Sequence, residues 1–181
     1  MHVAFGLSTL ALTVCAACGS NPAPAIDTHI GMTTGGDSPI APQADGAIEL
    51  ALRRSDGTFI DVGDLRGSVV VLFVFATFDG VSQMTLRPLE SLVSARPDVR
   101  VVGIAAQPSA RLLVDAYEHA LSPPFPITYD PEERVQTGES SLGPIEGIPT
   151  LIVLDARGLE SARHVGFIED ADLGALVAAA E

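Results

Sequence analysis

Cysteine is nearly absent from this sequence of 181 residues. The two cysteines, Cys15 and Cys18, both lie close to the N-terminus, and none follows them. A folded domain beyond residue 18 therefore contains no internal disulfide, no thiolate zinc site and no cysteine nucleophile.

Positive charge is also scarce. The chain has 10 lysine and arginine residues against 23 aspartate and glutamate residues, which gives a net charge of −13. With no basic patch to offset this balance, we expect neither nucleic acid binding nor electrostatic docking on anionic lipid. Apolar residues make up 47% of the chain, which is ample for the core of one domain with appendages.

The first 17 residues contain no Asp, Glu, Lys or Arg. Their apolar stretch, 3–17, is too short for a comfortable membrane span and predicts a signal peptide over residues 1–17, although only His2 could supply a positive charge near the start. The segment from Cys15 to Cys18 resembles the lipobox of bacterial lipoproteins, which implies cleavage before Cys18 and lipidation of its thiol. The alternative is an ordinary signal peptide without lipid.

Residues 18–46 are rich in Pro, Gly, Ser, Thr and Asp and offer little to bury. We interpret them as a flexible, lipid-anchored linker to a domain that spans residues 47–181. This organisation predicts a place in the bacterial cell envelope, with the domain anchored and facing the periplasm. Without lipidation, the mature protein would be soluble and periplasmic or secreted.

Apolar patterns divide the domain into strands and helices. Residues 48–53 and 58–62 alternate apolar and polar side chains around a turn, which predicts a β-hairpin. Largely apolar runs at 69–75 and 99–106 predict strands covered on both faces. Further strands are expected at 127–129, 151–155 and 160–165, and helices at 84–96, 109–121, 131–136 and near the C-terminus.

Two of these helices carry more detailed expectations. Ser109 is expected to cap the helix at 109–121. Apolar residues at helical spacing are expected to form the inner face of that helix, namely Leu112, Leu113, Ala116 and Tyr117. Asp130 is expected to open the helix at 131–136 from a solvated position.

The order of the elements predicts the fold class. Strands that alternate with helices indicate a mainly parallel sheet with helices on both faces, and the closing hairpin adds an antiparallel edge. The sequence thus predicts an α/β domain with a central mixed sheet, flanked by helices and extended by an N-terminal β-hairpin.

Five segments of the domain follow one another as they do in a known family. They are the strand entry at 67–73, Phe75-Ala76-Thr77-Phe78, the strand at 101–104, the proline-containing segment at 125–131, and Gly147-Ile148-Pro149-Thr150. On these segments, residues 46–181 resemble thioredoxin-fold proteins, most of all the membrane-anchored TlpA/ResA-like thiol–disulfide reductases and the related redoxin and peroxiredoxin (AhpC/TSA-like) group. The resemblance implies a thioredoxin-like fold in which the Ile148–Pro149 peptide bond is cis and faces the active-site turn.

In that family, a catalytic Cys-x-x-Cys occupies the turn. Asp79 and Ser82 stand at those two positions here, and neither can form a mixed disulfide or cycle between redox states. Alignment with the Sco-type copper chaperones instead would also lack both copper-binding cysteines, and a soft-metal site without thiolate is not expected. The turn therefore predicts no catalytic residue, no metal site and no cofactor.

Aspartate and serine both suit the start of a helix, where unpaired N–H groups and the helix dipole favour them. The first interpretation is structural, with Asp79 or Ser82 capping the following helix. The second is a binding surface, formed by Phe78, Asp79, Ser82, Ile148 and Pro149. In the family, the backbone at the cis-proline pairs with an extended substrate, which implies a peptide or protein partner in the groove between Asp79 and Pro149.

Three hypotheses of function stay open. The leading one is an exported binding or accessory module without a redox-active cysteine pair. The second is a thioredoxin- or peroxiredoxin-family oxidoreductase whose thiol comes from a partner protein or from unprocessed Cys15 and Cys18. The third is a carrier of a small molecule or metal, as in the Sco-like group.

Overall fold

The computed structural model describes residues 46–181. The signal peptide, the linker up to residue 45 and the lipidation of Cys18 lie outside the described residues and stay predictions. Within residues 46–181, no helix is long and apolar enough to cross a bilayer. In chain order, the elements are β1 (Ala51–Arg54), β2 (Phe59–Asp61), η1 (Val62–Leu65), β3 (Val70–Phe75), α1 (Gly80–Ala95), β4 (Arg100–Ala105), η2 (Ala110–Leu112), α2 (Val114–Leu121), β5 (Ile127–Tyr129), α3 (Arg134–Thr137), β6 (Thr150–Leu154), β7 (Glu160–Val165) and α4 (Asp170–Ala178).

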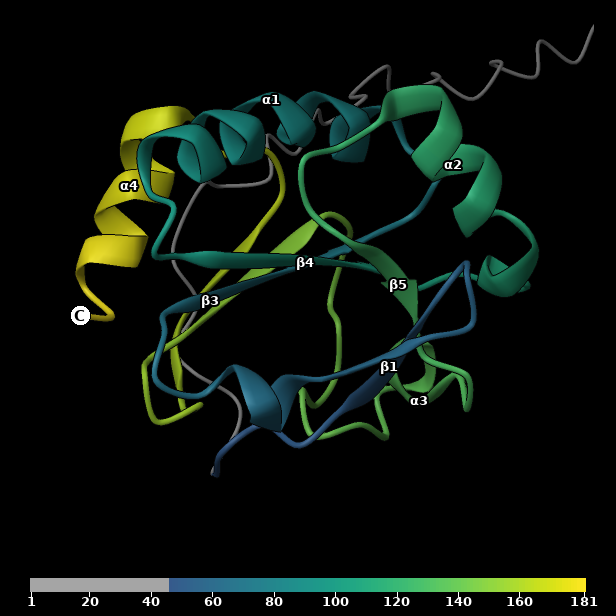
Figure 1. Cartoon of the computed structure of the whole chain (residues 1–181), viewed down its shortest axis with the longest axis horizontal. Coiled ribbons are helices and arrows are strands. Elements are labelled where there is room, and N and C mark those ends of the chain that lie inside the picture. The colour runs from purple at the N-terminus through teal and green to yellow at the C-terminus, as the bar shows by residue number, and fades with distance from the viewer. Residues whose placement is uncertain (1–45) are drawn as a thin grey trace, which may run out of the picture. The chain divides into compact units, whose positions relative to one another are not determined.

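The strands form one mixed sheet in the order β2-β1-β5-β4-β3-β6-β7. Strands β3, β4 and β5 run parallel, and β1 and β6 join them antiparallel on either side. Helices α1, α2 and α4 lie on one side of the sheet and α3 on the other (Figure 1). The predicted mixed sheet, flanked by helices and extended by the β1–β2 hairpin, is confirmed.

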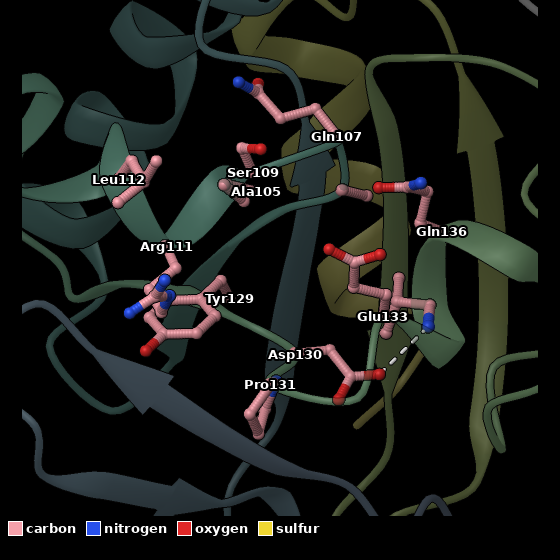
Figure 2. A pocket seen from close by; sticks show the side chains of 13 residues that line it. Ala105, Gln107, Ser109, Arg111, Leu112, Tyr129, Asp130, Pro131, Glu133 and Gln136 are labelled. Carbon is pink, nitrogen blue, oxygen red and sulfur yellow. Dashed lines mark hydrogen bonds between the residues drawn. The ribbon is translucent and has the colours of Figure 1, made fainter.

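The parallel strands β4 and β5 end at the same edge of the sheet. Their last residues, Ala105 and Tyr129, line a cavity of about 160 Å³ (Figure 2). Residues of η2 and of the turn before α3 complete its walls. In α/β sheets, the carboxyl ends of parallel strands are the usual place for ligands, because the loops that follow them diverge there.

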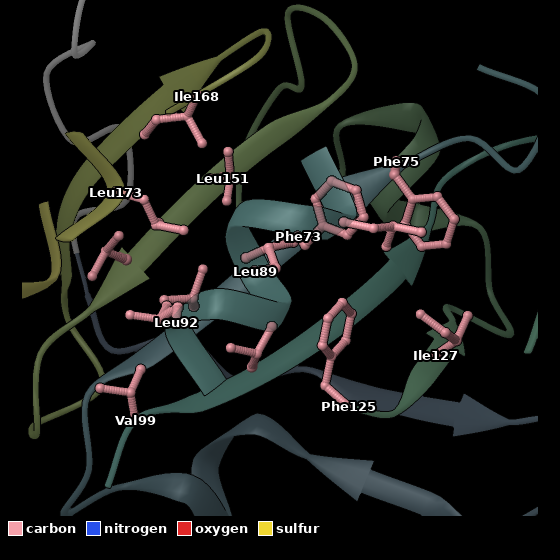
Figure 3. Packing of buried hydrophobic residues seen from close by; sticks show 14 of the residues in the cluster. Phe73, Phe75, Leu89, Leu92, Val99, Phe125, Ile127, Leu151, Ile168 and Leu173 are labelled. Atoms are coloured by element: carbon pink, nitrogen blue, oxygen red, sulfur yellow. The ribbon is translucent and has the colours of Figure 1, made fainter. Parts of the chain in front are cut away.

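Strand β3 separates two apolar cores. Its side chains alternate between the faces of the sheet, so Val71, Phe73 and Phe75 pack beneath α1, α2 and α4 (Figure 3). The intervening residues of β3 belong to the second core, which the β1–β2 hairpin and α3 cover. Because all six residues are buried, the run shows no polar alternation in the sequence. Burial of each such side chain stabilises the fold by about 1.5–3 kcal/mol.

The helix predicted to begin at Ser109 is wrong in its first turn. Ser109 has a φ of 59° and forms no capping bond, and a short 3₁₀ turn precedes α2. Leu112 and Leu113 are exposed, while Val114 and Tyr117 face the core. Helix α2 begins only at Val114, which shifts its buried face. Tyr117 is buried as predicted, whereas Leu112, Leu113 and Ala116 are exposed.

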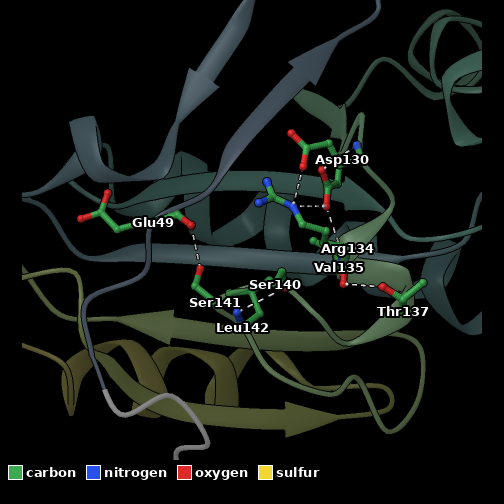
Figure 4. A network of polar contacts seen from close by, with 9 residues as sticks. Glu49, Asp130, Arg134, Val135, Thr137, Ser140, Ser141 and Leu142 are labelled. Atoms are coloured by element: carbon green, nitrogen blue, oxygen red, sulfur yellow. Dashed lines mark hydrogen bonds and ion pairs between the residues drawn. The ribbon is translucent and has the colours of Figure 1, made fainter.

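Asp130 is buried rather than solvated, which corrects a second prediction. Its Oδ1 accepts a hydrogen bond from the Glu132 N–H at 3.0 Å, and its Oδ2 accepts one from the Val135 N–H at 3.0 Å (Figure 4). Helix α3 begins at Arg134, later than predicted, because the carboxylate first closes a turn over residues 130–133. Arg134 Nε lies 3.9 Å from Asp130 Oδ2 and adds a weak ion pair.

Arg163, on β7, holds the loop that leads to the cis-proline. It forms a buried ion pair with Glu160, with Nε 2.8 Å from Oε1 and Nη2 2.8 Å from Oε2. The same guanidinium donates to the backbone oxygens of Leu142 at 2.7 Å and Pro144 at 3.2 Å. The loop is thereby fixed to the sheet by charge-assisted hydrogen bonds, which are the stronger class.

Candidate functional site

The turn after β3 and the proline before β6 lie at one edge of the sheet. Strands β3 and β6 are antiparallel neighbours, with Val74 opposite Thr150. The end of β3 therefore lies beside the start of β6, and the topology brings Asp79 and Pro149 to the same edge. The Ile148–Pro149 peptide bond is cis, as the resemblance implied.

Asp79 caps α1. Its Oδ2 accepts hydrogen bonds from the Ser82 N–H at 2.6 Å and from the Ser82 hydroxyl at 2.7 Å. The helix consequently begins at Gly80, whereas the apolar pattern predicted a start at Met84. Ser82 is fully buried, so it acts on any surface here only through Asp79. The structural interpretation of Asp79 as a helix cap is confirmed.

Gln107 is a residue of this turn that the sequence did not single out. Its side-chain oxygen accepts from the Thr77 N–H at 2.5 Å, and its amide donates to Thr77 Oγ1 at 2.9 Å. Gln83 adds a hydrogen bond from its amide to the Thr77 carbonyl at 3.2 Å. Gln107 is buried two residues after the end of β4. A polar residue so soon after an apolar strand is the one feature of the sequence that could have indicated its role in the turn. These contacts fix the backbone just before Phe78.

Four exposed apolar side chains surround the turn. Phe78 is 74% exposed, Met84 60%, Val81 40% and Ile148 37%. Of the eight large apolar residues that are exposed in the described part of the chain, these four belong to the turn, the first turns of α1 and the segment before the cis-proline. Pro149 itself is buried. We call Phe78, Val81, Met84 and Ile148 the apolar rim.

A groove continues from the apolar rim along α1. It has a volume of about 670 Å³ and lies between α1 and the segment that opens α4. Its lining combines apolar and charged residues, namely Gln83, Met84, Arg87, Pro88, Phe167, Glu169, Asp170 and Ala171. An extended chain that crosses the turn has room to continue here.

Two titratable side chains of this part of the fold, Tyr117 and His164, are buried. Burial raises the pKa of Tyr117 to about 12, but Tyr117 packs against Phe75 in the core, away from the turn. His164 belongs to β7, with its Nε2 2.9 Å from the Phe167 carbonyl oxygen. Among residues 46–181, no group of three or more His, Cys, Asp or Glu side chains could hold a metal ion.

No family model matches the sequence, and no curated protein matches it. Solved structures do resemble this one. A DsbF homologue from Corynebacterium diphtheriae has a TM-score of 0.64 and 19% identity, over 81% of this chain and 95% of that one. A thiol:disulfide interchange protein of the thioredoxin family from Chlorobium tepidum has a TM-score of 0.63 and 24% identity, over 76% and 97%. A secreted disulfide oxidoreductase of Mycobacterium tuberculosis has a TM-score of 0.58 and 18% identity, over 72% and 96%.

Two of these proteins are described as a thiol:disulfide interchange protein and a disulfide oxidoreductase, and the mycobacterial one is secreted. The identities are all below 25%, so the likeness concerns the arrangement of the backbone. It agrees with the mixed seven-stranded sheet flanked by helices. The domain has a thioredoxin-like fold.

Proposed function

We propose that this protein is a partner-binding module of the bacterial cell envelope, built on a thioredoxin-like fold and anchored by lipid at Cys18. The observation that supports it most is the apolar rim around the turn. A binding role for this edge accounts for large side chains in water, whereas a purely structural turn does not require them.

The chemistry of the rim favours an extended, apolar segment of a protein partner. Phe78 offers an aromatic surface of the kind that dominates binding energies at interfaces, and Met84 has a flexible side chain that adapts to different shapes. Asp79 and Gln107 hold the backbone of the turn, so a partner would meet a pre-organised surface. Residues 46–181 contain no cysteine, so binding there involves no disulfide exchange with this domain.

Capture of partners from the membranes of the source cell tests this proposal. Phe78→Ser and Met84→Ser should each weaken binding of the captured partner, measured again with purified components. Truncation of an aromatic hot spot costs at least about 2 kcal/mol, or roughly 30-fold in affinity. Leu112→Ser is the matched control, because Leu112 is similarly exposed but belongs to η2 and not to the apolar rim. Equal affinity of the Phe78 variant and the unaltered chain would refute the proposal.

A second candidate is thiol–disulfide exchange, which the descriptions of the similar structures favour. The chain has one C-x-x-C spacing, Cys15 to Cys18, outside the described residues. Reduction of insulin by the full chain discriminates the candidates. Turnover by the full chain that Cys15→Ser or Cys18→Ser abolishes would support thiol–disulfide exchange. Absence of turnover by the full chain would favour the binding module.

A further inference from the structure

The positive side chains of this chain are all arginines, ten in number. Six form ion pairs with carboxylates, namely Arg54, Arg66, Arg96, Arg134, Arg157 and Arg163. The other four form no ion pair among residues 46–181, although acidic residues outnumber basic ones; they are Arg53, Arg87, Arg100 and Arg111. Two of these four, Arg53 and Arg111, line one cavity.

This arginine cavity has a volume of about 280 Å³. It lies where β1 and β5 end, beside η2. Its lining contains no acidic residue and consists of Arg53, Arg54, Ser55, Gly57, Arg111 and Tyr129. The positive charges of Arg53 and Arg111 thus face one cavity without a carboxylate partner, which makes it a favourable place for an anion.

Strand pairing fixes the first arginine. Arg53 lies opposite Phe59 on one side and opposite Tyr129 on the other, so the three share one face of the sheet. The Arg53 guanidinium lies 5.5 Å from the centre of the Phe59 ring, which holds it without neutralising it. Arg54, the next residue, also lines the cavity, but its Nη1 lies 3.7 Å from Asp56 Oδ2.

The second arginine comes from the other side of the cavity. Arg111 belongs to η2, and Figure 2 shows its side chain next to the Tyr129 ring. Both residues also line the neighbouring cavity of Figure 2, so the two cavities adjoin. That neighbour contains Asp130 and Glu133, which would repel a second anionic group.

The acidic residues nearest to the arginine cavity are already engaged. Asp56 Oδ2 lies 3.7 Å from Arg54 Nη1, and Asp56 Oδ1 accepts two hydrogen bonds from Thr58. Glu118 Oε2 accepts a hydrogen bond from the Ser55 hydroxyl at 2.5 Å. Neither carboxylate pairs with the other two arginines of the cavity.

We propose that the arginine cavity binds the phosphate group of a ligand that carries a single phosphate. The planar fork of a guanidinium matches the oxygens of a phosphate, and two such groups from different elements can hold it from two sides. A chain of net charge −13 repels anions in general, so the attraction is confined to this cavity. The phosphate could belong to a soluble phosphate ester or to a lipid headgroup.

Titration of the purified full chain with inorganic phosphate, at constant ionic strength, tests the proposal. We expect saturable binding by calorimetry, which chloride does not reproduce. Arg53→Gln and Arg111→Gln should each reduce the affinity about tenfold, because each removes charged hydrogen bonds to the anion. Arg100→Gln is the control, since Arg100 is also unpaired but lies at the start of β4, outside the cavity. Arg111→Lys should retain part of the affinity and shows whether a weakened variant is merely misfolded.

Vesicles of phosphatidylcholine, with and without phosphatidic acid, distinguish the two sources. Binding to the anionic vesicles that inorganic phosphate displaces and Arg111→Gln abolishes would assign a lipid headgroup. Phosphate binding without vesicle binding would assign a soluble ester. Absence of saturable phosphate binding, or equal binding by the Arg53, Arg111 and Arg100 variants, would overturn the proposal.

Discussion

Asp79 is the residue that fixes the turn after β3 to the start of α1. A helix start stabilises negative charge, which in redox members of such folds favours a thiolate. Here the same position holds a carboxylate that accepts two hydrogen bonds from Ser82. The Asp79 carboxylate is thus engaged within the protein, and the exposed surface around the turn consists of the apolar rim.

We expect Asp79→Ala to lower the free energy of unfolding by about 1–2 kcal/mol, because α1 loses its cap and the buried Ser82 hydroxyl loses its acceptor. Urea denaturation followed by circular dichroism measures the change. Asp79→Asn retains an acceptor and should cost less than half as much. A loss as large in the asparagine variant would show that charge, and not the cap geometry, stabilises the turn.

Asp155 makes stability depend on pH. Burial alone would raise its pKa, but hydrogen bonds from the Arg157 side chain and from the backbone of Leu159 and Arg157 lower it overall. A carboxyl with a lowered folded-state pKa stabilises the fold fully above its unfolded-state value of about 3.9, and this contribution is lost as pH falls through the folded-state pKa.

Asp155→Asn should therefore be less stable than the unaltered chain near pH 7, by about 1–2 kcal/mol for the weakened hydrogen bonds. The difference should shrink as pH falls below about 4. Thermal unfolding between neutral and acidic pH measures it. A constant difference over the whole range would contradict the assignment of the effect to this carboxylate.

At the scale of elements, the loop before the cis-proline depends on β7. The ion pair between Arg163 and Glu160 is buried, and Arg163 also serves two backbone oxygens of that loop. Removing one partner of a buried pair leaves the other charge without compensation. The position of Ile148 and the cis-proline at the site thus rests on a contact with a neighbouring hairpin.

Arg163→Ala should lower the free energy of unfolding by about 3–5 kcal/mol, since it leaves the buried Glu160 carboxylate without a partner. The double variant Arg163→Met with Glu160→Leu removes both charges and should recover a large part of that loss. Chemical denaturation of the three chains measures the effect. Equal losses in the single and double variants would show that the backbone contacts, not the unpaired charge, dominate.

Elements with strong patterns could be predicted, and weak ones could not. The apolar run of β3 and the turn of the β1–β2 hairpin were found from residue type alone. The start of α1 was missed because residues 80–83 carry little apolar signal, and the cap contact with Asp79 decides it. The 3₁₀ turn before α2 depends on a positive φ at Ser109, which no pattern indicates.

For the whole molecule, the order of strands and helices predicted the mixed sheet, since chirality and pairing rules leave few arrangements. The distribution of positive charge over the folded surface could not be predicted in the same way. The sequence shows no basic patch, yet the fold brings Arg53 and Arg111 to one cavity from distant parts of the chain. The apolar rim likewise joins residues from α1 with Ile148, so both surfaces depend on tertiary contacts.

The two sides of the sheet differ in how firmly they are paired. Strands β3 and β4 pair through six residues each, whereas β1 is joined to β5 through only Arg53 and Arg54. The hairpin that carries Arg53 is therefore joined to β5 by few residue pairs, and few such contacts are typical of segments that open ahead of global unfolding. An anion held between Arg53 and Arg111 would link this hairpin to η2 and suppress its opening. Ligand binding in the arginine cavity would thereby change the local dynamics of the hairpin.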